Sequence, residues 1–136
     1  MKRQLFWFLV VGGAAAATHL GVVMLLVEGT GMAPLLANGL GWAVAFGVSF
    51  GGHYRLTFSG SGAALGPAAR RFGLISFLGF VINQAAYALA LRFSSQNYAL
   101  LLAAVLVGVA VLTYMFSRWW AFAGQRTAAP KRPAAR

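Results

Sequence analysis

Four long apolar segments, separated by short polar connections, constrain this chain more than any other feature. An α-helix rises about 1.5 Å per residue, so about 20 apolar residues cross the roughly 30 Å of hydrocarbon in a bilayer. The segments that reach this length cover residues 5–27, 34–52, 72–91 and 98–117. Because lipid offers no hydrogen bonds, a spanning backbone must satisfy its own polar groups, as a helix does. The sequence therefore predicts an all-α membrane protein, with four transmembrane helices built on residues 1–123.

The composition agrees with a membrane protein and excludes several kinds of catalytic site. Hydrophobic residues make up 60% of the chain and charged residues only 9%, whereas soluble domains carry about 25% charged residues. The chain has no Cys and no Asp, which excludes thiolate metal sites and Ser–His–Asp sets. It has a single acidic residue, so no pair of catalytic carboxylates exists, and it lacks the G-x-x-x-x-G-K-[ST] phosphate loop. We therefore expect no enzymatic activity, no cofactor and no metal.

The single acidic residue, Glu28, lies at the outer end of the first predicted helix, where we expect it to cap a loop. A small drug/proton exporter of similar size is one function to consider for such a chain. It would need an acid within the membrane to bind the proton. The position of Glu28 disfavours that function.

Lysine and arginine residues are unequally distributed along the chain, whose formal net charge is +10. Ten of the eleven lie at the N-terminus, in the connection 55–71 or at the C-terminal end, and Arg92 alone lies on the other side. Since basic residues in short loops stay on the cytoplasmic side, both termini are predicted to be cytoplasmic. The basic residues flank apolar runs, so nucleic acid is not an expected partner. Residues 124–136, rich in Ala, Pro and Arg, are expected to form a disordered basic cytoplasmic tail.

An alternative interpretation of the N-terminus is a signal peptide. The start "MKR", the apolar run that follows and the alanines at 14–16 fit such a segment and its cleavage site. However, the apolar run continues through "LGVVMLLV" and gives a full membrane span. Cleavage would also place the remaining helices in conflict with the charge distribution, so we favour the uncleaved helix.

The sequence can be laid on itself with a shift of 64 residues and no gap. This shift places Phe8 on Phe72, and His19 on Asn83, and it repeats the order of helix, short connection, helix and arginine-aromatic ending. Duplication of a two-helix unit would give two parallel repeats related by an axis along the membrane normal. The regular spacing of helices in any four-span protein is the other explanation. Both remain open at this point.

The second predicted helix carries small residues at every fourth position on two stripes. One stripe, which we call the 39–51 stripe, contains Gly39, Ala43, Gly47 and Gly51. The other, the 41–49 stripe, contains Gly41, Ala45 and Ser49. Small residues at this spacing let helix backbones approach closely in lipid. The sequence therefore predicts tight helix packing along this segment.

Polar residues are rare within the predicted helices, and two of them, His19 and Asn83, lie near the middle of the first and third. Polar side chains at this depth indicate either an interhelical hydrogen bond or a functional path. We expect a His19–Asn83 hydrogen bond, or a path along which these residues, with Asn38 and Gln84, contact sugar hydroxyls.

Several segments together resemble the GtrA-like family of small four-span bacterial membrane proteins. They are "FLVVGG" (8–13), "PLLANGLGWAVAFGVSF" (34–50), "HYRLTF" (53–58), "RRFGLISFLGFVINQ" (70–84) and "SRWWAF" (117–122). The resemblance covers residues 6–122. The family's two helix endings resemble Asn-Arg-x-Trp-(Thr/Val)-Phe, which the second ending here follows at Arg118, Trp120 and Phe122, with Ser117 where Asn is usual.

The first ending departs further from the family pattern. His53 stands where Asn is usual, Tyr54 replaces the basic residue, Arg55 follows it, and Leu56 replaces Trp. Within the first helix, His19 stands where family members often have Asp. These departures bear more on the identity of the sugar than on the class of ligand.

The resemblance implies translocation of a polyprenyl-phosphate-linked sugar across the bacterial cytoplasmic (inner) membrane for cell-surface polysaccharide glycosylation. Some relatives are proposed instead to anchor or recruit a membrane glycosyltransferase, which is the alternative function and a further expected partner. Arginine pairs well with phosphate because its planar fork donates two parallel hydrogen bonds. We expect a homo-oligomer, because four short helices enclose little volume.

The expected ligand contacts lie mainly at the two helix endings. The phosphate-binding candidates are Arg55, Arg118, His53 and Ser117, and the aromatic contacts for the sugar are Tyr54, Trp119 and Trp120. Arginine and tryptophan at a helix end also anchor many membrane proteins at the lipid interface. That simpler role remains open beside the ligand site.

Overall fold

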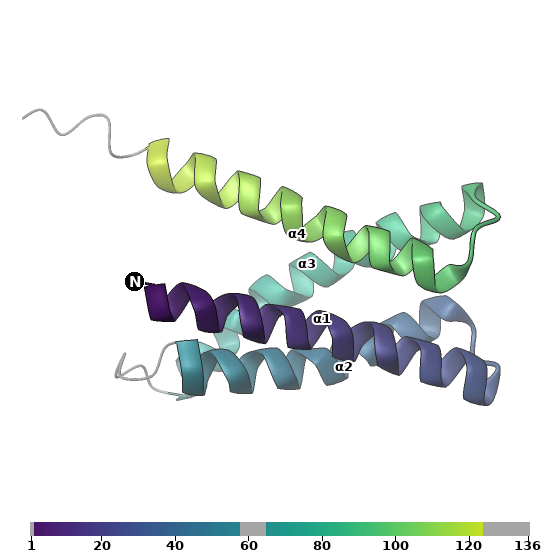
Figure 1. Cartoon of the computed structure of the whole chain (residues 1–136), viewed down its shortest axis with the longest axis horizontal. Helices are drawn as coiled ribbons and strands as arrows, with labels where there is room; N and C mark the ends of the chain where they lie inside the picture. Colours follow the sequence, from purple (N-terminus) through teal and green to yellow (C-terminus); the bar gives the residue numbers. More distant parts are fainter. Residues whose placement is uncertain (1, 58–64, 124–136) are drawn as a thin grey trace, which may run out of the picture.

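A computed structural model describes the backbone of residues 2–57 and 65–123, and within it most side chains as far as Leu112. The elements, in chain order, are α1 (Lys2–Thr30), α2 (Pro34–Gly52), the short π-helix η1 (His53–Thr57), α3 (Leu65–Phe93) and α4 (Tyr98–Ala123). The described ranges contain no strand. Figure 1 labels the long helices α1 to α4. The prediction of an all-α protein with four helices is confirmed.

Three of the helices are longer than the spans expected from the sequence, and α2 has the expected bounds. Pro34 occupies the first turn of α2, where its missing N–H costs nothing, and Gly31 turns the chain with a φ of 71°. The sequence predicts a connection over residues 55–71, and this prediction is wrong at both ends, which are helical. The π-helix continues to Thr57, and α3 begins at Leu65 with Pro67 tolerated in its first turn.

The helices suit a membrane in length and in the character of their outer faces. Three segments are long and apolar enough to cross a bilayer, namely Phe6–Thr30, Pro34–Leu56 and Phe72–Phe93, and the described apolar part of α4 is the shorter Tyr98–Leu112. Leu25 and Ile75 are more than 70% exposed. Large aliphatic side chains exposed along whole helices indicate contact with lipid. The chain is a multi-pass membrane protein.

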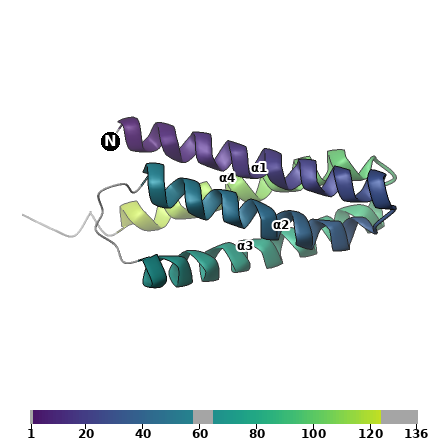
Figure 2. The same cartoon turned by 90° about the horizontal axis from the view of Figure 1, so that it is seen from below.

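Consecutive helices run in opposite directions. This arrangement brings basic residues that are far apart in the sequence to the same end of the bundle. The start of α1, η1, the start of α3 and the end of α4 lie at one end, as Figures 1 and 2 both show. Arg3, Arg55 and Arg70 belong to this end, which we call the basic end, whereas Arg92 lies at the opposite end. The charge separation expected from the sequence is therefore present in the fold, and its assignment to the cytoplasmic side stays a prediction.

The 41–49 stripe of α2 forms the close contact with α1. A Cβ added at Gly41 would lie 2.8 Å from His19 Cδ2 and 2.8 Å from Val23 Cγ2, and Ala45 is buried. By contrast, a Cβ at Gly47 on the 39–51 stripe would meet nothing within 4 Å. The 41–49 stripe, and not the 39–51 stripe, therefore brings the backbones of α1 and α2 together, as small residues do in lipid.

The most deeply buried side chains of the bundle lie at positions that are related by the 64-residue shift. Among the side chains that the structure describes, the four largest that are fully buried are Val23, Asn38, Tyr87 and Leu102. They form two pairs under the shift, Val23 with Tyr87 and Asn38 with Leu102. Equivalent burial at equivalent positions is what two copies of a two-helix unit would produce. This pattern supports the duplication, which stays a prediction.

The equivalence ends toward the basic end of the bundle. Val11 is 5% exposed because it packs against Gly52, whereas its counterpart Ile75 is 72% exposed. At the opposite end, Tyr98 Oη donates a hydrogen bond of 2.8 Å to Glu28 Oε1 and so connects α4 to α1. Figure 1 shows α4 diverging from α1 between this contact and the basic end. Glu28 thus connects two helices, in addition to its place beside the loop where capping was expected.

Candidate functional site

A buried hydrogen-bond network links three helices at mid-depth. Asn38 of α2 is fully buried, and its Oδ1 lies 2.7 Å from His19 Nε2 of α1. Asn38 Nδ2 donates to Asn83 Oδ1 at 2.9 Å and to Gln84 Oε1 at 2.6 Å, both on α3. Gln84 Nε2 donates in turn to the carbonyl oxygen of Leu35 at 3.0 Å. These residues form what we call the polar network.

The direction of every hydrogen bond in the polar network follows from the carbonyl of Leu35. A backbone carbonyl only accepts, so Gln84 presents Nε2 to it and Oε1 to Asn38. Asn38 must then donate through Nδ2, which leaves its Oδ1 to accept from His19. His19 therefore carries a proton on Nε2. One backbone carbonyl thus fixes the donor and acceptor roles of all four side chains, Gln84, Asn38, His19 and Asn83.

The sequence correctly indicates the residues of this network but not their connections. The expected direct bond between His19 and Asn83 is wrong, because Asn38 lies between them and bonds to both. Asn38 and Gln84, expected only as contacts along a path, are members of the network. A role for any of them in sugar contact stays a prediction.

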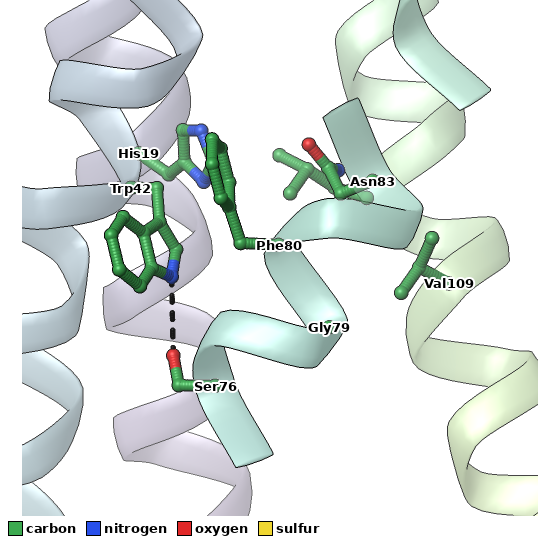
Figure 3. A pocket seen from close by; sticks show the side chains of 8 residues that line it. His19, Trp42, Ser76, Gly79, Phe80, Asn83 and Val109 are labelled. Carbon is green, nitrogen blue, oxygen red and sulfur yellow. Dashed lines mark hydrogen bonds between the residues drawn. The ribbon is translucent and has the colours of Figure 1, made fainter. Parts of the chain in front are cut away.

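A pocket of about 180 Å³ adjoins the polar network (Figure 3). Side chains and backbone from all four helices line it: His19, Trp42, Ser76, Gly79, Phe80, Asn83, Leu106 and Val109. Two pairs related by the 64-residue shift, His19 with Asn83 and Trp42 with Leu106, meet here. The pocket therefore lies where the two halves of the chain face each other.

Asn83 contributes an unpartnered donor beside this pocket. Its Oδ1 accepts from Asn38, but its Nδ2 has no hydrogen-bond partner although the residue is only 4% exposed. A buried amide donor without a partner costs about 1–3 kcal/mol. Native structures rarely leave such a group without a water or ligand to receive its protons. Asn83 therefore keeps a spare donor next to the pocket, and this nitrogen is itself covered by neighbouring atoms.

An aromatic ladder connects the pocket to the basic end. Trp42, Phe46, Phe50 and Tyr54 follow each other at every fourth position of α2 and η1, with ring centroids 5.9–6.1 Å apart. Rings of α3 pack beside them, including Phe80 on Trp42 and Phe72 on Phe50. The sequence analysis missed this ladder, although the i, i+4 spacing of four aromatic residues is its visible signal. It forms a continuous row of packed rings from Trp42 to Tyr54.

The residues expected to capture phosphate at the first helix ending do not share one surface. Arg55 is exposed, whereas His53 is buried, with its ring centroid 5.1 Å from that of Phe8 and 5.8 Å from that of Phe72. The π-helix winds this turn more widely than an α-helix, and such turns are common at functional sites. Tyr54 is half-buried and stacks on Phe50. Among these three residues, Arg55 is the one available to a charged head group at the surface.

The second helix ending lies on the last turns of α4. Ser117, Arg118, Trp119 and Trp120 are helical there, and their side chains fall outside the described residues. The end of α4 and η1 are at the same end of the bundle (Figure 1). Joint action of Arg118 and Arg55 stays a prediction.

Trp42, Ser76 and Phe80 were not candidates in the sequence analysis, yet they line the pocket. The indole Nε1 of Trp42 donates to Ser76 Oγ at 3.2 Å, and the Trp42 and Phe80 rings stack with centroids 4.7 Å apart. Figure 3 shows the indole directed at the serine hydroxyl. These contacts place two aromatic faces and two polar groups around one small volume.

Comparison with known proteins adds one positive finding. The family model described as "GtrA/DPMS, transmembrane domain" matches residues 7–122. No curated protein and no solved structure matches the chain. The matched residues include α2, α3, most of α1 and α4, the polar network and every residue that lines the pocket. The chain belongs to the GtrA/DPMS transmembrane domain family.

Proposed function

We propose that this protein translocates a polyprenyl-phosphate-linked sugar across the bacterial cytoplasmic membrane, to supply glycosylation of cell-surface polysaccharide. The family is associated with flipping of such lipids. The ligand has a lipid-soluble tail, one anionic phosphodiester and a polar sugar. Its barrier to crossing is the transfer of charge and hydroxyl groups through hydrocarbon, where one charged side chain already costs about 2.5–3.5 kcal/mol.

The observation that carries this proposal is the polar network beside a pocket at mid-depth. Polar side chains within a membrane are costly and usually functional. Here Asn38 is fully buried, and Asn83 retains an unpartnered donor in the wall of the pocket. A lipid-linked sugar brings hydroxyl oxygens that accept hydrogen bonds. The network therefore suits a substrate whose polar part must pass this depth.

Capture of the substrate is assigned to the basic end, which we place at the cytoplasmic face. Arg55 is exposed there, and Arg118 is at the end of α4. A guanidinium binds a phosphodiester through paired, charge-assisted hydrogen bonds. The aromatic ladder leads from Tyr54 to the pocket and offers ring faces to the sugar. Net movement follows synthesis on the inner face and consumption on the outer face.

The direct test is reconstitution in liposomes with a labelled polyprenyl phosphosugar. Wild-type protein should move the lipid between leaflets, and Arg55→Ala and Arg118→Ala should each slow that movement. If the protein leaves the leaflet distribution unchanged, the proposal is wrong.

A second candidate function, recruitment of a membrane glycosyltransferase, is favoured by two smooth outer faces. Gly13, Ala17 and Gly21 on α1 are exposed at every fourth position, and a Cβ added at either glycine meets nothing within 4 Å. Gly47 and Gly51 on α2 are equally open. Small residues at this spacing are typical of helix–helix contacts in membranes. These faces suit another membrane helix, from a glycosyltransferase or from a second copy in a homo-oligomer.

The two candidate functions differ in their response to mutation. If the protein only recruits an enzyme, Arg55→Ala and Arg118→Ala leave sugar transfer in cells intact, and Gly13→Leu or Gly21→Leu abolishes it. If it flips the lipid, the arginine variants lose sugar transfer. Incorporation of labelled sugar into surface polysaccharide measures both.

A further inference from the structure

We propose that the pocket binds the sugar ring of the substrate at mid-depth, with Asn83 as hydrogen-bond donor and Trp42 with Phe80 as an aromatic wall. This inference rests on the proposed function, because that function brings the lipid-linked sugar into the membrane. It assigns the sugar to residues different from Tyr54, Trp119 and Trp120 at the helix endings. The site is a second station, separate from phosphate capture.

The hydrogen-bond directions of the polar network fix the Asn83 amide in the required orientation. Asn38 presents its donor to Asn83, so Asn83 must present Oδ1 to Asn38 and keep both protons of Nδ2 on the other side of the amide. That nitrogen is buried and has no partner, and Asn83 lines the pocket. A sugar hydroxyl or ring oxygen is an acceptor that would receive this donor. Rotation of the amide would bring two donors together at Asn38, so the orientation is not interchangeable.

The aromatic side of the pocket suits a sugar ring. Trp42 and Phe80 stack on each other with ring planes 21° apart, so each ring has at most one face left for a ligand, and the Trp42 N–H is directed at Ser76 Oγ. Aromatic faces carry negative charge density, which attracts the partly positive C–H groups of a sugar face. The Ser76 hydroxyl still has its own proton to donate. An apolar face together with a few fixed polar groups is the usual composition of a small-ligand site.

The volume suits a single sugar ring. The pocket of about 180 Å³ is smaller than the sites of drug-sized ligands, which begin near 300 Å³. None of the eight lining residues is acidic, so the phosphate attached to the sugar meets no fixed negative charge.

The distance from Arg55 makes the pocket a separate station. Trp42 and Arg55 are thirteen residues apart along α2 and η1, which corresponds to roughly 20 Å of helix at 1.5 Å per residue. One sugar ring is far shorter than this distance. The same substrate molecule therefore cannot occupy the pocket with its sugar while its phosphate stays on Arg55, and the two sites are occupied in succession.

The test compares lipids that do or do not carry a sugar. Protein in nanodiscs, purified without sugar-headed detergent, is titrated with polyprenyl-phosphoglucose, -phosphomannose and -phosphoarabinose, and with sugar-free polyprenyl phosphate. We expect at least one phosphosugar to bind about tenfold more tightly than polyprenyl phosphate, as one or two added hydrogen bonds would give.

Two variants fill the pocket from different helices, and each has a matched control. Gly79→Leu adds a side chain to the pocket from α3 without replacing a residue of the polar network, and Gly108→Leu adds the same side chain to α4 outside the lining. A Cβ at either position meets nothing within 4 Å. Leu106→Phe fills the pocket from α4, and its neighbour Val107, which is 64% exposed, gives the control Val107→Phe. The filling variants should lose the preference for the phosphosugar and keep the affinity for polyprenyl phosphate.

The inference is overturned if no phosphosugar binds more tightly than polyprenyl phosphate. It is also overturned if Gly79→Leu and Leu106→Phe prefer the phosphosugar as strongly as their controls do. Leaflet movement measured on the same preparations separates this result from the fate of the proposed function. A preference that depends on the pocket, without movement between leaflets, supports the sugar site and contradicts the flippase. Movement between leaflets without such a preference supports the flippase and contradicts the sugar site.

Discussion

Asn38 Nδ2 donates to Asn83 Oδ1 at 2.9 Å, and this contact joins α2 to α3 in the middle of the bundle. The same nitrogen also reaches Gln84, and the oxygen of Asn38 faces His19. One amide thus satisfies polar groups on two neighbouring helices. Since Asn83 uses only its oxygen in this contact, its nitrogen is left for a ligand in the adjoining pocket.

Replacing Asn38 with leucine should destabilise the bundle. The change removes three interhelical contacts and leaves the N–H of His19 and the amide oxygens of Asn83 and Gln84 without their partner. Polar contacts between membrane helices contribute about 0.6 kcal/mol each on average, so we expect a loss of about 2 kcal/mol in the free energy of unfolding in mixed micelles. Leu36→Ala, at a lipid-facing position of the same helix, is the control. A loss no greater than that of the control would contradict the role of Asn38.

Alanine substitutions at two glycines of α2 should change the free energy of unfolding by amounts that differ in sign or size. At Gly41 the new Cβ would lie 2.8 Å from side-chain atoms of His19 and Val23 and 3.0 Å from the His19 carbonyl oxygen, so α1 and α2 must separate. Overpacking of this kind costs about 1–3 kcal/mol. At Gly47 the Cβ meets nothing within 4 Å, so Gly47→Ala should leave stability unchanged or slightly raised. Equal unfolding free energies for the two variants would show that the α1–α2 contact is not as close as described.

The sequence predicts the helices well because hydrocarbon thickness sets the length of each apolar run. It does not predict which side of a helix faces which neighbour. A membrane helix is apolar on all sides, so no amphipathic stripe indicates its rotation. For this reason the two small-residue stripes of α2 are equivalent in the sequence, although the close contact with α1 is at Gly41 of the 41–49 stripe. The central place of Asn38 depends on the same rotation.

The pocket illustrates the same limit. Its lining combines side chains from four helices, and only His19 and Asn83 were singled out by being polar at depth. Trp42 and Phe80 resemble ordinary apolar residues in the sequence, and their stacking depends on how α2 and α3 cross. The first turns of α3 lie within the connection expected over residues 55–71, and α3 accommodates Pro67 there because it is at the N-terminal end of the helix.

Removing the charge at position 55 should slow transport, and removing the charge at position 92 should not. Arg55 is exposed at the basic end, where the phosphate is captured, and Arg92 is exposed at the opposite end. A hydrogen bond to a charged group contributes about 1.5–3 kcal/mol, so Arg55→Ala should lower the rate of leaflet exchange about tenfold or more. Arg55→Lys should retain part of the rate. Equal rates for Arg55→Ala and Arg92→Ala would remove Arg55 from the capture site.

The orientation in the membrane can be tested with single cysteines, because the chain has none of its own. Gly66, near the start of α3, and Ser95, in the connection between α3 and α4, are exposed at opposite ends of the bundle. With the basic end in the cytoplasm, a membrane-impermeant maleimide should label Ser95→Cys in intact cells and Gly66→Cys only after lysis. The opposite labelling pattern would reverse the proposed orientation.

The central claim, movement of a lipid-linked sugar between leaflets, is tested most directly in proteoliposomes. Vesicles are prepared with a radiolabelled polyprenyl phosphosugar in both leaflets, and impermeant periodate is added to oxidise the sugars on the outside. With wild-type protein, the sugars that began in the inner leaflet should also become oxidised, faster than with Arg55→Ala. If that inner pool stays as protected as in vesicles without protein, the protein does not flip this lipid.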